Sequence, residues 1–270
     1  MQGKETRKTK TPARQAVKKP YLKGRAFSPL AIRRGLRVLS YLLVSAVLYF
    51  FLGQLMVIDL TWLRVLINLG VISAFCALLF GTGARDGEGD VSFAEIAWNR
   101  REQGQTVSQD DLAKCFHPLK GFVTALAGAL PLVLLCLVYA LMAVKDTYTL
   151  GALPGWLAGY QQRADIGLAL SYYHDRAGFG LNDLLRLVVR LLVFPFVNMV
   201  GSRNVEGLLL IERLSPLLVL VPPLFYGLGY WRGENYRARV HGGIAANARR
   251  QARRRKKKQQ PRRQEPRQLV

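Results

Sequence analysis

The chain has 270 residues, and it combines 50% hydrophobic residues with a formal net charge of +22. The two properties are segregated: residues 1–37 hold 12 basic residues and one acid, and residues 232–270 hold 14 basic residues and two acids. The region between these ends is apolar and close to neutral. This distribution excludes an ordinary soluble globular domain and indicates a membrane protein with basic tails.

Four apolar runs between the tails have the length of membrane-spanning helices. The hydrocarbon core of a bilayer is about 30 Å thick, which a helix crosses with about 20 apolar residues. The first run is too long for a cleaved signal peptide and follows a long basic tail, which favours an uncleaved anchor. The sequence therefore predicts an all-α integral membrane protein, a four-span transmembrane helical bundle with spans at residues 36–58, 63–81, 121–144 and 208–231.

The basic tails also predict the direction of the spans. Lys and Arg residues that flank spans remain in the cytoplasm, so we expect both termini inside and an even number of spans. Residues 82–120 then face the cytoplasm, and residues 145–207 face outward. Short turns and basic ends are typical of bacterial inner-membrane proteins, so we expect a multi-pass protein of the cell membrane.

A fifth apolar run, residues 183–201, follows Asn182, a residue type that favours a helix N-cap. Arg186 and Arg190 lie one turn apart on one face of this run, and two arginines near the middle of a bilayer are costly. A fifth span would also place one basic tail outside. We therefore predict an outer amphipathic helix that lies in the interface, with a re-entrant segment as the alternative.

The cytoplasmic loop between the second and third spans carries two helix-start signals. Ser92 with Glu95 has the pattern of a capping box. Ser108 with Asp111 has the same spacing, with aspartate in place of glutamate at the third position. Pro118 then ends the second short helix. These signals predict a cytoplasmic helical hairpin over residues 92–117.

The two tails, residues 1–35 and 232–270, have the composition of disordered segments. They contain too few apolar residues to offset the entropy of ordering the chain. Residues 232–250 could instead continue the fourth helix, although Gly242 and Gly243 would weaken it.

No catalytic motif is present in the sequence, and no cofactor is expected. Residues 86–90 imitate the start of a calcium loop, but Val91 and Trp98 occupy positions that require Gly and Glu, so a solvated loop is preferred. His117 lies near Cys115 without further ligands, and three cysteines form neither a zinc pattern nor a disulfide framework. We expect no metal site.

Charged residues within a span are the sequence signal for a transport path. Glu212 and Arg213 lie near the outer end of the fourth span, where Ser215-Pro216 is typical of a helix restart that would leave them at the interface. Kinks at Pro222 and Pro223 would free backbone carbonyls near the middle of that span. In the outer segment, a further candidate polar site consists of His174 and Asp175.

The strongest polar feature is the C-terminal tail. Its charge has three interpretations: it fixes topology alone, it binds anionic lipid, or it binds the phosphates of nucleic acid or the ribosome. No aromatic residue follows Tyr236, so sequence-specific reading of RNA is not expected. The candidate contacts for lipid or another polyanion are Arg249, Arg250, Arg253, Arg254, Arg255, Lys256, Lys257, Lys258, Arg262 and Arg263.

These observations lead to three functional hypotheses in order of preference. The first is a non-enzymatic scaffold or accessory subunit whose basic tails contact anionic lipid or an acidic protein partner. The second is a small transporter or channel subunit, and the third is an intramembrane enzyme. Small residues spaced four apart in the third span, Thr124 with Gly128 and Ala125 with Ala129, allow either internal packing or dimerisation, so the oligomeric state stays open.

Overall fold

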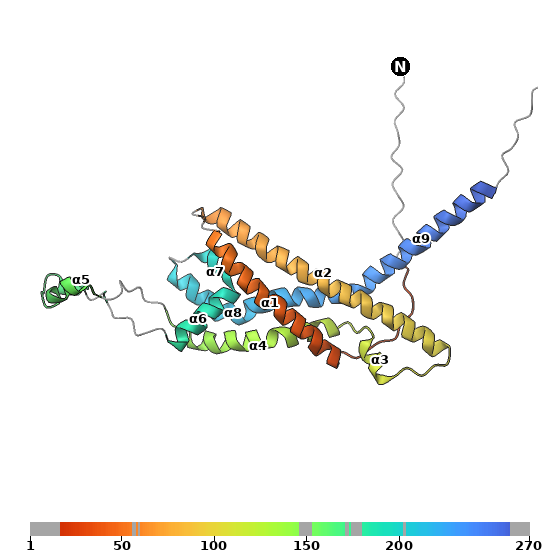
Figure 1. The fold of residues 1–270 in the computed structure, drawn as a ribbon, viewed down its shortest axis with the longest axis horizontal. Helices are drawn as coiled ribbons and strands as arrows, with labels where there is room; N and C mark the ends of the chain where they lie inside the picture. The colour runs from red at the N-terminus through yellow and green to blue at the C-terminus, as the bar shows by residue number, and fades with distance from the viewer. Residues whose placement is uncertain are drawn as a thin grey trace, which may run out of the picture.

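The computed structural model describes residues 17–55, 58, 60–145, 153–170, 173, 180–201 and 204–259. Within these residues the protein is helical and has no strands (Figure 1). Its elements are α1 (Pro29–Leu55), α2 (Thr61–Glu102), α3 (Gln109–Lys114), α4 (Lys120–Met142), a 3₁₀ helix (Gly155–Tyr160), α5 (Gly167–Leu170), α6 (Leu181–Leu192), α7 (Phe194–Val200), α8 (Val205–Trp231) and α9 (Gly233–Gln259).

Four of these helices, α1, α2, α4 and α8, are long and apolar enough to cross a membrane, which agrees with the predicted multi-span helical protein. Helix α8 packs against α2 and α4, and α1 packs against α4. Large apolar side chains remain exposed on the outward faces, as a lipid-facing surface requires. Examples from the four helices are Leu48, Leu66, Leu126 and Leu217.

Glycines allow the closest approach of the helices. A side chain at Gly83 or Gly87 of α2 would collide with backbone of α8, at Tyr226 and Tyr230 respectively. The i, i+4 spacing of the two glycines places both on one face of α2, as in small-xxx-small packing of membrane helices. Gly128 of α4 meets α1 at Gly35 in the same way. The small residues that the sequence offered for either packing or dimerisation therefore serve internal packing at Gly128.

Helix α2 corrects the prediction for the cytoplasmic loop. It is continuous for 42 residues, so Ser92 lies inside a helix and caps none, and residues 86–90 form neither a calcium loop nor a solvated loop. At 1.5 Å per residue the helix is about 63 Å long, twice the thickness of a hydrocarbon core. The second cap is confirmed, because the Ser108 hydroxyl accepts a hydrogen bond from the Asp111 amide (3.1 Å) at the start of α3.

Both tails approach the bundle at one end, here named the tail end, where α1 begins and α8 stops. Disorder was predicted for both tails, but the structure differs in the residues that it describes. Residues 17–28 run along α2 and α9, with a backbone bond from Val17 to Ala238 (3.1 Å) and another from Leu22 to Ala94 (3.3 Å). Helix α1 then begins at Pro29, and α9 extends to Gln259.

The opposite end, named the loop end, carries α6 and α7. Helix α6 begins after Gly180 rather than at Asn182, and the Asp183 carboxylate accepts a hydrogen bond from the Gly180 amide (3.2 Å). The run predicted as one helix is divided between α6 and α7 near Val193, where Pro195 lies in the first turn of α7. Neither piece is long enough to span a bilayer. The placement of this segment in the membrane interface stays a prediction.

The tail end has its own apolar core, which includes Leu22 of the N-terminal segment, Val91 of α2, Cys115, Phe116 and Tyr230. The Cys115 side chain is fully buried, and burial raises the pKa of its thiol. Because the thiolate is the reactive form, we expect the native protein to resist a maleimide at neutral and mildly alkaline pH. Mass spectrometry of the labelled protein checks this, and rapid labelling of Cys115 before denaturation would contradict it.

Candidate functional site

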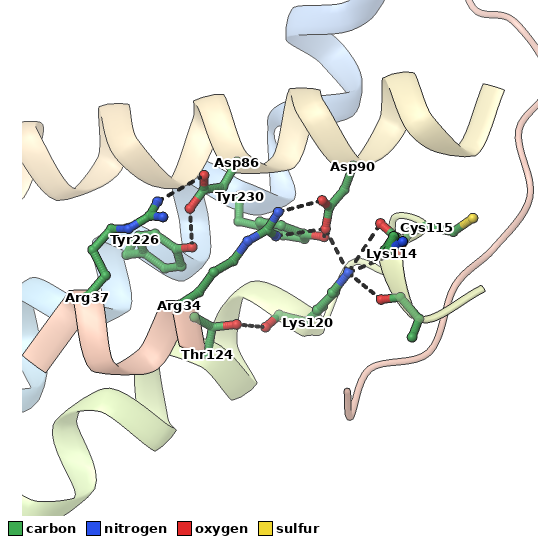
Figure 2. Close-up of polar contacts among 11 residues, drawn as sticks. Arg34, Arg37, Asp86, Asp90, Lys114, Cys115, Lys120, Thr124, Tyr226 and Tyr230 are labelled. Carbon is green, nitrogen blue, oxygen red and sulfur yellow. Dashed lines mark hydrogen bonds and ion pairs between the residues drawn. The ribbon is translucent and has the colours of Figure 1, made fainter. Parts of the chain in front are cut away.

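Asp90 of α2 lies at the centre of a buried polar network at the tail end (Figure 2). Arg34 of α1 binds both of its carboxylate oxygens, at 2.9 and 2.8 Å. The Lys120 ammonium of α4 and the Tyr230 hydroxyl of α8 donate to Oδ2, at 2.8 and 2.6 Å. A single carboxylate therefore connects all four candidate membrane helices, with the bidentate arginine geometry that fixes orientation most firmly.

Lys120 is completely buried, so its three donors require partners. Besides Asp90, it donates to the backbone carbonyls of Ala113 (2.8 Å) and Cys115 (3.2 Å). Helix α3 and the turn after it are thereby bound to the same network. The position of Lys120, at the first residue of α4, places the charge at the end of the span rather than within it.

Asp86 forms a second layer of the network one turn earlier on α2. It accepts a hydrogen bond from the Tyr226 hydroxyl (2.8 Å), and its other oxygen lies 3.7 Å from the guanidinium of Arg37. Asp86 and Asp90 lie on one face of α2, and the two tyrosines lie four residues apart on the facing side of α8. The two layers therefore hold α2 and α8 in a fixed register.

A third group of contacts attaches α9 to the extension of α2. The Glu95 carboxylate lies 2.8 Å from His241 Nε2 and accepts a hydrogen bond from Arg237 Nε (3.2 Å). At the start of α9, a side chain at Gly233 would collide with the α2 backbone at Gly87. The α2 extension and the first half of α9 therefore form one support beyond the tail end.

The loop end has a separate buried network around Glu212 of α8, whose side chain is 1% exposed. Arg190 of α6 donates to Oε1 (2.7 Å), and the Tyr139 hydroxyl of α4 donates to Oε2 (3.0 Å). Arg186 lies 3.5 Å from the same carboxylate and donates to the Tyr139 oxygen (2.7 Å). The two arginines that made a fifth span costly thus point at a buried acid and attach α6 to the bundle.

The structure separates the residues that the sequence grouped as a candidate transport site. Glu212 is buried, whereas the neighbouring Arg213 is exposed on another side of α8. Helix α8 is continuous through Ser215 and Pro216, so the predicted restart is wrong. Pro222 and Pro223 lie inside the same helix. The remaining pair, His174 and Asp175, lies outside the residues that the structure describes.

A small cavity lies among α1, α2, α4 and α8 beneath α7. Pro222 lines it together with Tyr49, Ile72, Leu132 and Phe196. Neither Glu212 nor Arg213 is among its lining residues. The cavity is therefore mostly apolar and is not part of either charged network.

The basic residues of the C-terminal tail lie apart from both networks. In α9 the five arginines Arg249, Arg250, Arg253, Arg254 and Arg255 are exposed, and within the described part of the chain none of them forms an ion pair or hydrogen bond. Residues 256–258 continue the helix, and Arg262 and Arg263 lie outside the described residues.

The tail-end network was missed by sequence reasoning because its members are far apart along the chain. Arg34 and Tyr230 are separated by 196 positions and meet only through Asp90. One local signal was available: two acids four residues apart and two tyrosines four residues apart, each pair on one helical face.

No group of three or more His, Cys, Asp or Glu side chains among the described residues could hold a metal ion. Comparisons of the chain with family models, curated proteins and solved structures found no match. The function is therefore argued from the geometry alone.

Proposed function

We propose that the protein is a non-enzymatic membrane component, a scaffold or accessory subunit. The four apolar helices hold it in the cell membrane with both tails in the cytoplasm. Its basic C-terminal helix contacts anionic lipid or an acidic partner. The orientation is supported by the concentration of Lys and Arg in the two tails and by the approach of both tails to the same end of the bundle.

The buried and the exposed charges of the protein differ in whether they have partners within the chain. The acids buried in the bundle, Asp90 and Glu212, are each neutralised by basic side chains of the same chain. The arginines between Arg249 and Arg255 have no such partner and face solvent. Buried pairs of this kind hold helices together, whereas exposed charge of one sign attracts charged partners from solution.

Deletion of residues 249–270 tests the proposal. We expect the deletion to remove the partner proteins that cross-link to the full-length protein in native membranes, while insertion and the thermal midpoint of the bundle stay unchanged. Quantitative mass spectrometry of the cross-linked, affinity-purified material provides the measurement.

A second variant tests whether the loss of basic charge elsewhere on the protein has the same effect. Five exposed basic residues elsewhere on the same side of the protein can be changed to glutamine: Lys19, Lys23, Arg25, Arg100 and Arg101. This variant should keep its partners. Equal recovery of partners from the deletion and the full-length protein, with no binding to anionic vesicles or to nucleic acid either, would remove the basis for the proposal.

A further inference from the structure

The second half of α9 extends beyond the contacts that attach the helix to α2. Among the described residues, the last ion pair along α9 is His241 with Glu95, and the side chains from Asn247 to Arg255 are exposed. At 1.5 Å per residue, Arg249 lies about 12 Å past His241 and about 24 Å from Gly233. Figure 1 shows α9 leaving the tail end obliquely, away from α6 and α7. The basic segment is thus presented to solvent on a supported helix.

The charge density of this segment matches that of a nucleic acid. Residues 249–258 contain eight basic residues in ten positions and no acid. In a helix these occupy about 15 Å, which gives one positive charge for about every 1.9 Å. Duplex DNA carries one negative charge for about every 1.7 Å of its axis.

The charge is also distributed around the helix rather than on one face. At about 100° per residue, the five arginines from Arg249 to Arg255 leave no gap wider than about 120°. A helix that lies in a membrane interface requires an apolar face, and a coiled coil requires an apolar seam. The major groove of a B-form duplex admits an α-helix and places phosphates on both sides of it. The segment fits that environment.

The position of the segment separates it from the protein's own membrane surface. Asp90 with its partners lies where α1 and α4 begin and α8 ends, which marks the cytoplasmic limit of the bundle. At physiological ionic strength the field of an anionic leaflet decays over about 8 Å. Arg249 lies about three times that length along α9 from Gly233. The field of the protein's own leaflet is therefore weaker at Arg249 than at the start of α9.

From these observations we propose that residues 249–258 of α9 bind the phosphodiester backbone of a duplex or folded nucleic acid in the cytoplasm, without sequence preference. The inference rests on the proposed function and names the acidic partner. Phosphate contacts alone position a protein on nucleic acid and read no sequence. The absence of aromatic residues after Tyr236 is consistent with this mode, because no side chain is available to stack on bases.

The test uses the full-length protein in nanodiscs of neutral lipid, with a fluorescent DNA duplex in one arm and a fluorescent RNA hairpin in the other. If about four phosphates are neutralised, raising salt from 50 to 200 mM should weaken binding about 100-fold. Replacement of the five arginines between Arg249 and Arg255 by glutamine should weaken it by roughly 10-fold or more at 100 mM salt. Duplexes of unrelated sequence should bind equally.

The five-residue control with Lys19, Lys23, Arg25, Arg100 and Arg101 changed to glutamine should retain binding to within about 3-fold, because the net charge is matched and only the location differs. Equal loss in both variants would overturn the inference in favour of general electrostatics. Binding to anionic vesicles without binding to either nucleic acid would overturn it in favour of lipid. If the deletion loses an acidic protein partner while nucleic acid never binds, the proposed function stands and this inference fails.

Discussion

Replacement of Asp90 by alanine should destabilise the bundle by about 3–5 kcal/mol, the range for removing one partner of a buried ion pair. The change leaves the ammonium of Lys120 buried without a counter-charge and removes the acceptor shared by Arg34 and Tyr230. Lys120 is completely buried in the native protein, so it has no route to water without opening the tail end. Unfolding of the detergent-solubilised protein by titration with SDS, followed by circular dichroism, gives the free energy.

A graded series separates the network from general effects of mutation. Tyr230→Phe removes one hydrogen bond to a carboxylate and should cost about 1.5–3 kcal/mol, less than Asp90→Ala. Asp110→Asn changes an exposed acid on α3 and should stay within about 0.5 kcal/mol. Asp90→Ala should also expose Cys115, whose carbonyl binds Lys120, to maleimide. An Asp90 variant no less stable than Tyr230→Phe would show that the carboxylate does not hold the helices together.

The spans could be read from the sequence because the bilayer imposes a length and a composition that each span satisfies on its own. An even span count was expected from local charge, and the described parts of the two tails lie at one end of the bundle, while their side of the membrane stays a prediction. Helix boundaries were less accurate, since α1 begins at Pro29 and α2 extends to Glu102. The polar extension of a membrane helix has no run of apolar residues. A helix boundary predicted from apolar composition therefore falls before the true end of the helix.

The glycines in the middle of α2 explain why a loop was predicted there. Gly81, Gly83, Gly87 and Gly89 weaken a helix by their intrinsic preference, and the acids among them gave the stretch the composition of a loop. Two of them serve the tertiary structure instead, because Gly83 and Gly87 allow α8 to approach the α2 backbone. Tertiary contact here overrides local preference, and no window of sequence contains that information.

Helix α9 shows the same effect at the tail end. Gly242 and Gly243 predicted a weak helix, but His241 immediately before them is held by Glu95, 146 positions earlier in the chain. Contacts between residues so far apart in the chain cannot be predicted from the spacing of residues in a single sequence. The candidate contacts in the basic tail could be named from the sequence because a run of like charges is recognised without any partner in the protein, and their role stays a prediction.

Replacement of Glu212 by glutamine decides between a structural and a transport role at the loop end. Glutamine keeps the shape and can accept hydrogen bonds, but it removes the negative charge that Glu212 presents to Arg186 and Arg190. We expect a loss of about 2–3 kcal/mol, below the range for a fully enclosed pair because Arg190 is partly exposed. Hydrogen exchange should increase in α6, which the carboxylate attaches to the bundle, and not in the residues that contact Asp90.

Glu206→Gln is the matched control, because Glu206 lies on the same helix and is 84% exposed in its pair with Lys145. That variant should change stability by less than about 0.5 kcal/mol. Reconstituted vesicles provide the second readout: a structural role predicts no solute flux in the wild type over a broad panel and none gained or lost on substitution. A wild-type flux that Glu212→Gln abolishes, with hydrogen exchange in α6 unchanged, would instead make Glu212 part of a transport path. The structure favours the first outcome, because two arginines and a tyrosine of the same chain already surround the carboxylate.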